Sequence, residues 1–336
     1  MYPYNYHNTD ISEVSFLVTG GAGFIGSNIV QYLLKYGAKK VRVLDDFSNG
    51  HRHNLTEFHS HPSFELLEGD IRDLATCKRA MEGIDYVSHQ AALGSVPRSI
   101  NDPITSNDVN VSGFLNMLVA LKESDSVKRM VYAASSSTYG DSKTLPKVED
   151  VIGKPLSPYA VTKLVNELYA DVFGKTYGTD VIGLRYFNVF GPKQSPNGAY
   201  AAVIPLFMQA IKDGKSPTIN GDGGQTRDFT FVDNAVQANV RGFFASEAAA
   251  NQVYNIACGE RISVNDLWGF LNKAANTSIE ANYGPERQGD VRDSLADIAK
   301  AEQLLGYVPN YTVAEGLHKT WDWFSNHENL QSKASK

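Results

Sequence analysis

One short stretch of the chain, Ser157-Pro158-Tyr159-Ala160-Val161-Thr162-Lys163, carries residues that could move a proton. Ser157 and Pro158 are residue types favoured at the start of a helix, so Tyr159 and Lys163 would lie one turn apart on one face. A free tyrosine has a pKa of about 10 and is a poor base at neutral pH. A nearby ammonium and the positive end of the helix would both favour the tyrosinate. The pattern therefore predicts a tyrosine that removes a proton from a hydroxyl group.

A glycine-rich stretch nearer the N-terminus, GGAGFIG from Gly20 to Gly26, could bind the phosphates of a dinucleotide. Gly20, Gly23 and Gly26 follow an apolar run and open a segment with helical spacing, which is the context that this motif requires. The three glycines respectively allow a tight turn, close approach of the backbone to a pyrophosphate, and close packing of helix on strand. Unpaired N–H groups at the start of the helix would then face the phosphates.

Acidic residues follow the next two apolar runs. Asp45 lies where an acid accepts hydrogen bonds from ribose hydroxyls and repels a 2′-phosphate, so the motif predicts NAD rather than NADP. Asp46 could share this role, and Asp70 and Ile71 could contact the adenine. With NAD beside Tyr159, the predicted chemistry is loss of a proton from a hydroxyl while hydride leaves the same carbon.

These residues must be positioned by strands and helices that alternate along the chain. Apolar runs predict strands at 15–19, 40–44, 64–67, 86–89, 129–134 and 181–186, and helical spacing predicts helices at 24–36, 76–81, 109–122 and 158–177. The alternation predicts an α/β fold, a doubly wound parallel Rossmann sheet with helices on both faces and a smaller C-terminal α/β region. Ligands of such sheets bind beyond the carboxyl ends of the strands, where the polar and glycine residues lie.

The chain is expected to divide into two parts. Residues 1–190 form the predicted NAD-binding Rossmann domain, rejoined by about 229–258, where 253–257 predicts a further strand. Residues 191–228 and 259–330 form the predicted substrate-binding region. The polar ends, 1–12 and 327–336, are expected to be mobile.

The composition narrows the class of protein. The chain has 336 residues and a net charge of −6, which leaves no basic excess for a nucleic-acid partner. Its two cysteines, Cys77 and Cys258, have no metal-type spacing, so neither a metal site nor a disulfide framework is expected. We find no signal-peptide pattern and no apolar stretch of membrane-spanning length, which favours a cytoplasmic protein without a membrane partner.

Four longer stretches complete the pattern: HQAALGSVPRS from His89, ASSSTYG from Ala134, RYFNVFG from Arg185 and RQGD from Arg287. With them the chain resembles the extended short-chain dehydrogenase/reductase family, and within it bacterial UDP-N-acetylglucosamine 4-epimerases, over about 14–323. The resemblance implies interconversion of UDP-GlcNAc and UDP-GalNAc through transient C4 oxidation to a 4-keto sugar by tightly bound NAD. It also implies a role in supplying sugar nucleotides for surface polysaccharide, and a homodimer paired through helices such as 109–122 and 158–177.

The motifs and the resemblance together give a set of candidate site residues. The catalytic candidates are Ser135, Tyr159 and Lys163. The NAD-binding candidates are Gly20, Gly23, Phe24, Ile25, Gly26, Asp45, Asp46, Ser48, Gly50, Asp70, Ile71, Gln90, Ala91, Ala92, Tyr159, Lys163 and Phe187. The candidates for the UDP-sugar are Gly94, Ser95, Ser135, Ser136, Asn188, Ala202, Val203, Arg227, Arg287 and Ser294. By this resemblance Arg227 and Arg287 hold the diphosphate, a group that guanidinium pairs with bidentately.

The chain departs from galactose-type epimerases at two places. Many of those have Asn-Asn-Leu where this chain has Ala201-Ala202-Val203, so the backbone of Ala202 and Val203 would have to replace a side-chain amide. Ser294 stands where galactose-specific members often carry a tyrosine. The smaller side chain would leave room for an N-acetyl group at C2 of the sugar.

Other functions remain open from the sequence. A UDP-glucose/UDP-galactose or UDP-uronate 4-epimerase is the nearest alternative, and a uronate would want a basic contact for its carboxylate, for which Arg98 is available. A 4,6-dehydratase usually carries Asp-Glu where this chain has Ser136-Ser137. A non-catalytic NAD-binding regulator would not need the intact Ser135, Tyr159 and Lys163.

Overall fold

The computed structural model describes residues 2–195, 202–286 and 292–327. Within these residues the main feature is a seven-stranded parallel sheet in the order β11-β6-β5-β4-β1-β2-β3. The strands are β1 (Ser15–Thr19), β2 (Lys40–Asp45), β3 (Phe64–Glu68), β4 (Tyr86–His89), β5 (Arg129–Ser135), β6 (Val181–Tyr186) and β11 (Gln252–Ile256). The strand order reverses between β1 and β4, which is where such sheets bind ligands. The predicted doubly wound parallel fold is confirmed.

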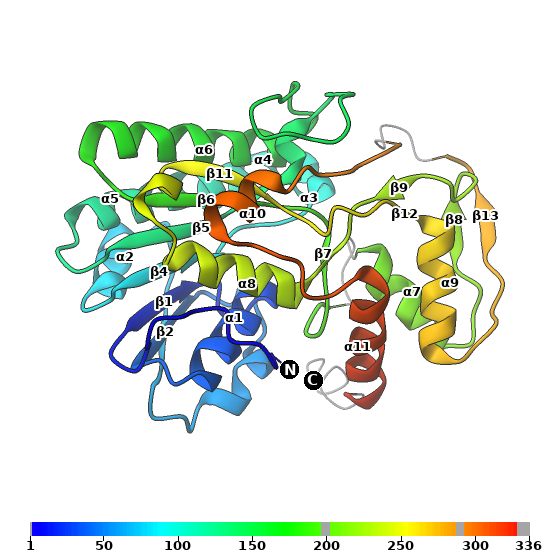
Figure 1. Ribbon diagram of the computed structural model, residues 1–336, viewed down its shortest axis with the longest axis horizontal. Helices are drawn as coiled ribbons and strands as arrows, with labels where there is room; N and C mark the ends of the chain where they lie inside the picture. The colour runs from blue at the N-terminus through cyan, green and yellow to red at the C-terminus, as the bar shows by residue number, and fades with distance from the viewer. Residues whose placement is uncertain (1, 196–201, 287–291, 328–336) are drawn as a thin grey trace.

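Helices cover both faces of the sheet (Figure 1). One face packs on α1 (Phe24–Lys35), α8 (Val232–Phe243) and α10 (Ala299–Leu305), and the other on α2 (Leu74–Met81), α5 (Phe114–Glu123) and α6 (Pro158–Tyr177). Successive side chains of a strand point to opposite faces. In β1, Phe16 and Val18 accordingly join the first core and Leu17 joins the second.

A smaller region lies beside the sheet (Figure 1). Its helices are α7 (Val203–Lys212), α9 (Val264–Ala275) and α11 (Val313–Asn326), which share a separate apolar core. Short strand pairs tie this region together: β7 (Val189–Phe190) with β10 (Thr230–Phe231), β9 (Thr226–Arg227) with β12 (Ile262–Ser263), and β8 (Thr218–Asn220) with β13 (Asn282–Gly284).

The helix expected at 109–122 differs from the prediction. A π-helical turn, η3 (Asp108–Gly113), precedes α5, and two short helices, α3 (Val96–Asn101) and α4 (Pro103–Asn107), precede η3. Ser95 caps α3 and Asp102 caps α4, and each of these helices has a proline in its first turn. These helix-start signals are present in the sequence, but the two helices have only six and five residues and are too short to show a periodic apolar pattern. The expected bounds of α6 are confirmed.

The N-terminal segment was expected to be mobile, and that prediction is wrong for the described residues. Tyr2, Tyr6 and Ile11 are buried. The ring of Tyr6 stacks on Tyr32 with centroids 5.3 Å apart, and its hydroxyl donates to Asp233 at 2.7 Å. Tyrosine carries a large apolar ring behind its hydroxyl, so a segment that is polar by composition can still be anchored by ring burial.

Candidate active site

The glycine loop lies between β1 and α1. Gly20 has φ of +66°, and a Cβ atom there would stand 2.7 Å from the backbone nitrogen of Ala91 after β4, so only glycine fits. A Cβ atom on Gly26 would lie 2.2 Å from the carbonyl oxygen of Gly20, so a larger residue would not fit there either. Gly23 is the N-cap of α1 and contributes no side-chain cap, which leaves the N–H groups of the first turn available to a phosphate.

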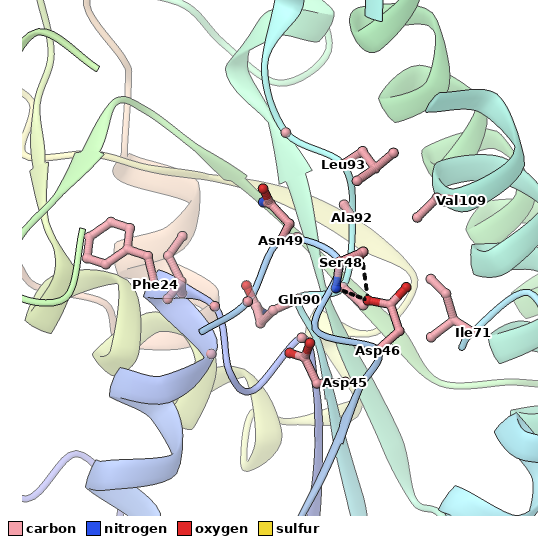
Figure 2. Close-up of a pocket in the computed structure, with 18 of the residues that line it drawn as sticks. Phe24, Asp45, Asp46, Ser48, Asn49, Ile71, Gln90, Ala92, Leu93 and Val109 are labelled. Carbon is pink, nitrogen blue, oxygen red and sulfur yellow. Dashed lines mark hydrogen bonds between the residues drawn. The ribbon is translucent and has the colours of Figure 1, made fainter. Parts of the chain in front are cut away.

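A first cavity opens at this loop and along the carboxyl ends of β1 to β5. Figure 2 shows Asp45, Asp46, Ser48, Ile71 and Gln90 around it. The cavity is lined by nearly all the predicted cofactor residues: Gly20, Gly23, Phe24, Ile25, Gly26, Asp45, Asp46, Ser48, Gly50, Asp70, Ile71, Gln90, Ala91, Ala92, Tyr159 and Lys163. Gly94, predicted to contact the sugar, also lines it.

The carboxylate of Asp45 joins the glycine loop to β2. It accepts the N–H of Ala22 at 2.8 Å through Oδ2 and the N–H of Phe47 at 2.9 Å through Oδ1. Burial raises the pKa of Asp45, and these two hydrogen bonds oppose the rise. Asp46 is exposed and accepts both the N–H and the hydroxyl of Ser48, as the dashed lines in Figure 2 mark. A ribose hydroxyl that donates to Asp45 would therefore bind a carboxylate whose position is already fixed by two backbone hydrogen bonds.

The predicted base lies at the start of α6, which Ser157 caps by accepting the N–H of Ala160 at 3.1 Å. Lys163 is buried and its ammonium donates to the carbonyl of Ala133 at 2.7 Å. The ammonium stands 5.9 Å from the centroid of the Tyr159 ring. Burial lowers the pKa of Lys163 to about 8, so the side chain still carries its positive charge for the most part at neutral pH.

Ser135, the last residue of β5, reaches the same point from the sheet. Burial raises the pKa of Tyr159, and a hydrogen bond with Ser135 opposes that rise. The Ser135 hydroxyl oxygen also accepts the N–H of Ser137 at 3.2 Å and its hydroxyl at 2.9 Å. The fold thus brings Ser135, Tyr159 and Lys163 together, the arrangement that proton removal from a bound hydroxyl group requires.

A second cavity shares Ser135 and Asn188 with the first and is also lined by Arg227 of β9. Four predicted sugar-contact residues line it together with Ser135: Ser136, Asn188, Arg227 and Ser294. Asn188 lines both cavities and donates from its side-chain amide to the carbonyl of Asp228 at 2.8 Å. Arg227 donates to the carbonyls of Thr226 at 2.9 Å and of Arg292 at 3.2 Å.

Other predicted positions lie elsewhere. Phe187, expected beside the cofactor, is fully buried and lines the second cavity rather than the first, because it follows β6 on the side facing Tyr139. Ser95 lines neither cavity, since its hydroxyl caps α3. Ala202 and Val203 start α7 and line neither. Arg287 lies outside the described residues.

The sequence did not point to several lining residues. In the first cavity these include Asn49, Leu93, Val109 and Tyr186. Asn49 is polar and lies between Ser48 and Gly50, two residues that the sequence predicts to contact the cofactor. Its residue type and position could therefore have identified it. The others are apolar or aromatic residues that no local pattern distinguishes from the core. In the second cavity the main omission is Lys147, which is buried and belongs to none of the motifs.

Four further observations complete the description of the site and its surroundings. Among the described residues, no cluster of three or more His, Cys, Asp or Glu side chains could hold a metal ion. His89 is buried and its ring bonds to the Thr19 hydroxyl at 2.8 Å, and Arg98 donates to Asn49 at 3.1 Å. No helix in the described ranges has the length and apolar character that crossing a membrane would need.

Known proteins resemble this chain over more than nine tenths of its length. Residues 16–257 match the model of the NAD dependent epimerase/dehydratase family. A UDP-glucose 4-epimerase of Mycolicibacterium smegmatis is 36% identical over 312 residues, which cover 92% of this chain and 98% of that protein. The structure of a UDP-N-acetylglucosamine 4-epimerase from Methanobrevibacter ruminantium, in complex with UDP-N-acetylmuramic acid, is 38% identical with a TM-score of 0.88, covering 93% of this chain and 98% of that one.

A third similar protein has been solved with a UDP-sugar and NAD bound. The structure of a UDP-glucuronic acid 4-epimerase from Bacillus cereus, in complex with UDP-glucuronic acid and NAD, is 32% identical with a TM-score of 0.85, covering 93% and 99% of the two chains. The site suits NAD. The glycine loop and the uncapped N–H groups at the start of α1 would bind the phosphates, and the carboxylate of Asp45 would bind a ribose. This chain belongs to the NAD dependent epimerase/dehydratase family.

Proposed function

We propose that the chain interconverts UDP-N-acetylglucosamine and UDP-N-acetylgalactosamine, in the supply of sugar nucleotides for a surface polysaccharide. The observation that carries this proposal is Ser294, which lines the second cavity together with Ser135 and Ser136. Small hydroxyl side chains there leave space and hydrogen-bond partners for an N-acetyl group. The similar methanogen structure, named as a UDP-N-acetylglucosamine 4-epimerase, agrees with this choice.

The proposed mechanism uses the three groups that meet between the cavities. Tyr159 removes the proton of the C4 hydroxyl, while Ser135 hydrogen-bonds the same oxygen and fixes its position. The ammonium of Lys163 favours the tyrosinate through its charge. NAD held by the residues of the first cavity would supply reversible hydride transfer at C4, the chemistry by which the configuration of that carbon could be inverted. Tyr159 then gives its proton back to the C4 oxygen.

The remaining assignments follow from the same proposal. The residues that line the first cavity hold NAD, with Asp45 on a ribose. Arg227, with Arg287, holds the diphosphate, and its guanidinium is suited to bidentate pairing. Residues 1–190 with about 229–258 act as the NAD-binding domain, and 191–228 with 259–330 as the substrate-binding region. Serines at positions 136 and 137, where dehydratases usually have Asp-Glu, disfavour loss of water.

We also propose that the protein acts as a homodimer. On α6, Val161, Leu168 and Val172 are about half exposed and share one helix face. Ile100 and Ile104 add exposed apolar surface from α3 and α4, which pack against α6. A surface of this kind is typical of a protein interface. Replacing Leu168 by Glu is expected to give monomers in sedimentation experiments, and an unchanged sedimentation coefficient would contradict the proposed dimer.

The substrate is tested with a panel of UDP-sugars. Inversion at C4 is followed by NMR for UDP-GlcNAc, UDP-GalNAc, UDP-Glc and UDP-Gal, and the acetylated pair is expected to have the higher kcat/KM. Ser294→Tyr should reduce kcat/KM for UDP-GlcNAc by about 10-fold or more and leave UDP-Glc largely unchanged, since steric exclusion from a pocket is worth a few kcal/mol. A parent enzyme that prefers UDP-Glc would overturn the assignment.

A further inference from the structure

The hydroxyl of Ser135 receives two hydrogen bonds from one residue. Its oxygen accepts the backbone N–H of Ser137 at 3.2 Å and the hydroxyl of Ser137 at 2.9 Å. A serine hydroxyl has two acceptor lone pairs and one hydrogen. The two bonds from Ser137 therefore occupy both lone pairs and leave the hydrogen of Ser135 to donate to another group. Because Ser135 is buried, this hydrogen needs an acceptor within the site.

The oxygen of Tyr159 is such an acceptor. Burial raises the pKa of Tyr159, and a hydrogen bond with Ser135 opposes this rise. A hydrogen bond lowers the pKa of a phenol when it stabilises the charged form, so Ser135 is the donor and the tyrosinate is the acceptor. The hydrogen bonds thus form a chain with one direction. The Ser137 hydroxyl donates to Ser135, and Ser135 donates to Tyr159.

A short helical turn fixes Ser137 relative to Ser135. Ser135 ends β5 and is the N-cap of this turn, η4 (Ser136–Tyr139), which carries Ser137. The next residue, Thr138, is buried, and its hydroxyl donates to the backbone carbonyl of Ser135 at 2.9 Å. Ser137 itself lines the second cavity. The position of the Ser137 hydroxyl beside Ser135 is therefore set by the end of the sheet.

A Ser135 that only donates suits both states of the reacting oxygen. In the proposed function the C4 hydroxyl gives its proton to Tyr159 and becomes a carbonyl. The C4 oxygen can accept a hydrogen bond from Ser135 before and after this step. A Ser135 that accepted instead would compete with Tyr159 for the C4 proton. A fixed donor also stabilises negative charge as it moves from the tyrosinate toward the C4 oxygen.

We propose that Ser137 is a positioning residue that acts through Ser135. By filling the acceptor sites of the Ser135 oxygen, Ser137 commits the Ser135 hydrogen to Tyr159 before a sugar binds and to the C4 oxygen afterwards. This inference rests on the proposed function, since it takes C4 as the reacting carbon and Tyr159 as its base. Donation by the Ser137 hydroxyl also polarises Ser135 and makes it a stronger donor.

The test is Ser137→Ala in the holoenzyme, which removes the hydroxyl of residue 137 and keeps its N–H. The kcat for C4 inversion, followed by NMR, is expected to fall by about 3- to 10-fold, the usual effect of one lost hydrogen bond. The KM should change by less than about 2-fold, because the lost interaction acts on the chemical step and not on binding. Ser137→Thr keeps a hydroxyl and should restore most of kcat.

The pH profile gives a readout that a merely structural role would not change. With a weaker donor at Ser135 the tyrosinate is less stable, so the pKa of Tyr159 rises. The acidic limb of kcat/KM for Ser137→Ala should therefore move to higher pH by about 0.5 to 1 unit. Every variant keeps the charged residues that line the two cavities, so this shift reports the Ser135 hydroxyl. Within the described residues these are Asp45, Asp46, Asp70, Lys147, Lys163 and Arg227.

A double-mutant cycle shows whether Ser137 acts through Ser135. In a Ser135→Ala background, Ser137→Ala should have no further effect on kcat, because the hydroxyl that it positions is gone. Bound NAD reports folding and should be unchanged, since Ser137 lines the second cavity and not the first. Ser137→Cys, which replaces the hydroxyl by a weaker donor, measures the same effect if Ser137→Ala loses its cofactor. Ser142→Ala, in the loop after η4 and lining neither cavity, is the control and should behave as wild type.

Two results would overturn the role of Ser137. One is a Ser137→Ala enzyme with the kcat and pH profile of the wild type. The other is an equal loss of kcat with and without the Ser135 hydroxyl. The cycle is run with the UDP-sugar that the wild type inverts fastest. A preference for UDP-Glc over UDP-GlcNAc would refute the proposed substrate and leave the result for Ser137 intact.

Discussion

The two cavities meet at Ser135 and Asn188 but carry opposite charge. The charged residues that line the first are Asp45, Asp46, Asp70 and Lys163, and those that line the second, within the described residues, are Lys147 and Arg227. Both proposed ligands, NAD and a UDP-sugar, contain a diphosphate. The two cavities would therefore bind the same chemical group in two different ways. The first cavity offers backbone N–H groups at a helix start, and the second offers side-chain cations.

This difference has a structural origin. The walls of the first cavity are ends of strands in one sheet, whose hydrogen-bonded ladders fix each residue relative to the next. Carboxylates can then lie near bound phosphates, because aligned N–H groups compensate for their repulsion. The second cavity is closed by segments from distant parts of the chain, such as Arg227 on β9 and Ser294, where single substitutions can change the substrate without disturbing the sheet.

The largest expected effect lies where the cavities meet. Tyr159→Phe removes the proposed base and should lower kcat by about 10²- to 10⁴-fold, the usual contribution of a positioned acid or base. NAD content should stay the same, which an absorbance assay of the released cofactor would check. Tyr177→Phe, at the exposed end of the same helix, is the matched control. A fully active Tyr159→Phe enzyme would mean that proton transfer uses another group.

A smaller effect is expected in the first cavity alone. Asp45→Asn replaces an acceptor oxygen by an N–H donor opposite the N–H of Ala22 or Phe47, and it removes the charge facing a ribose. Retention of NAD should fall by about 10- to 100-fold, as for a lost charged hydrogen bond. Dialysis followed by cofactor quantification measures this, and UDP affinity should not change. Asp102→Asn keeps the α4 cap and serves as control. Equal losses of NAD and UDP affinity would show that the cavities are not independent.

The smallest effect concerns the wall of the second cavity. Ser157→Ala removes the hydroxyl that caps α6, and such a change costs about 1 kcal/mol of stability. The melting temperature should fall by about 2 °C, and Ser157→Asp, which also caps helices well, should restore it. Calorimetry of the three proteins measures the shift. An unchanged melting temperature for Ser157→Ala would mean that the contacts of α6 with the sheet outweigh its cap.

The proposed NAD site was largely predictable because its signals are local. Gly20 must adopt a positive φ, Asp45 must end a strand, and Ser157 must cap a helix, so each residue type reports its own backbone environment. Parallel strands place their carboxyl ends at one edge of a sheet, so residues that follow different strands could be predicted to meet. The spacing of Tyr159 and Lys163 predicted the base, whereas the role of Ser135 came from the family resemblance. Ser135 and Tyr159 are distant in the chain and interact in the fold.

By itself the sequence determined the parallel fold and the glycine loop and led to the proposed proton-transfer group, since strand and helix periods, glycine conformations and helix spacing are local properties. Only the tertiary structure decided that Phe187 lines the second cavity, that Tyr2 and Tyr6 anchor the N-terminal segment, and that Lys147 reaches the site. Burial and charge pairing depend on which distant segments pack together. No local pattern shows that Lys147 is buried and donates to the backbone carbonyl of Ser142.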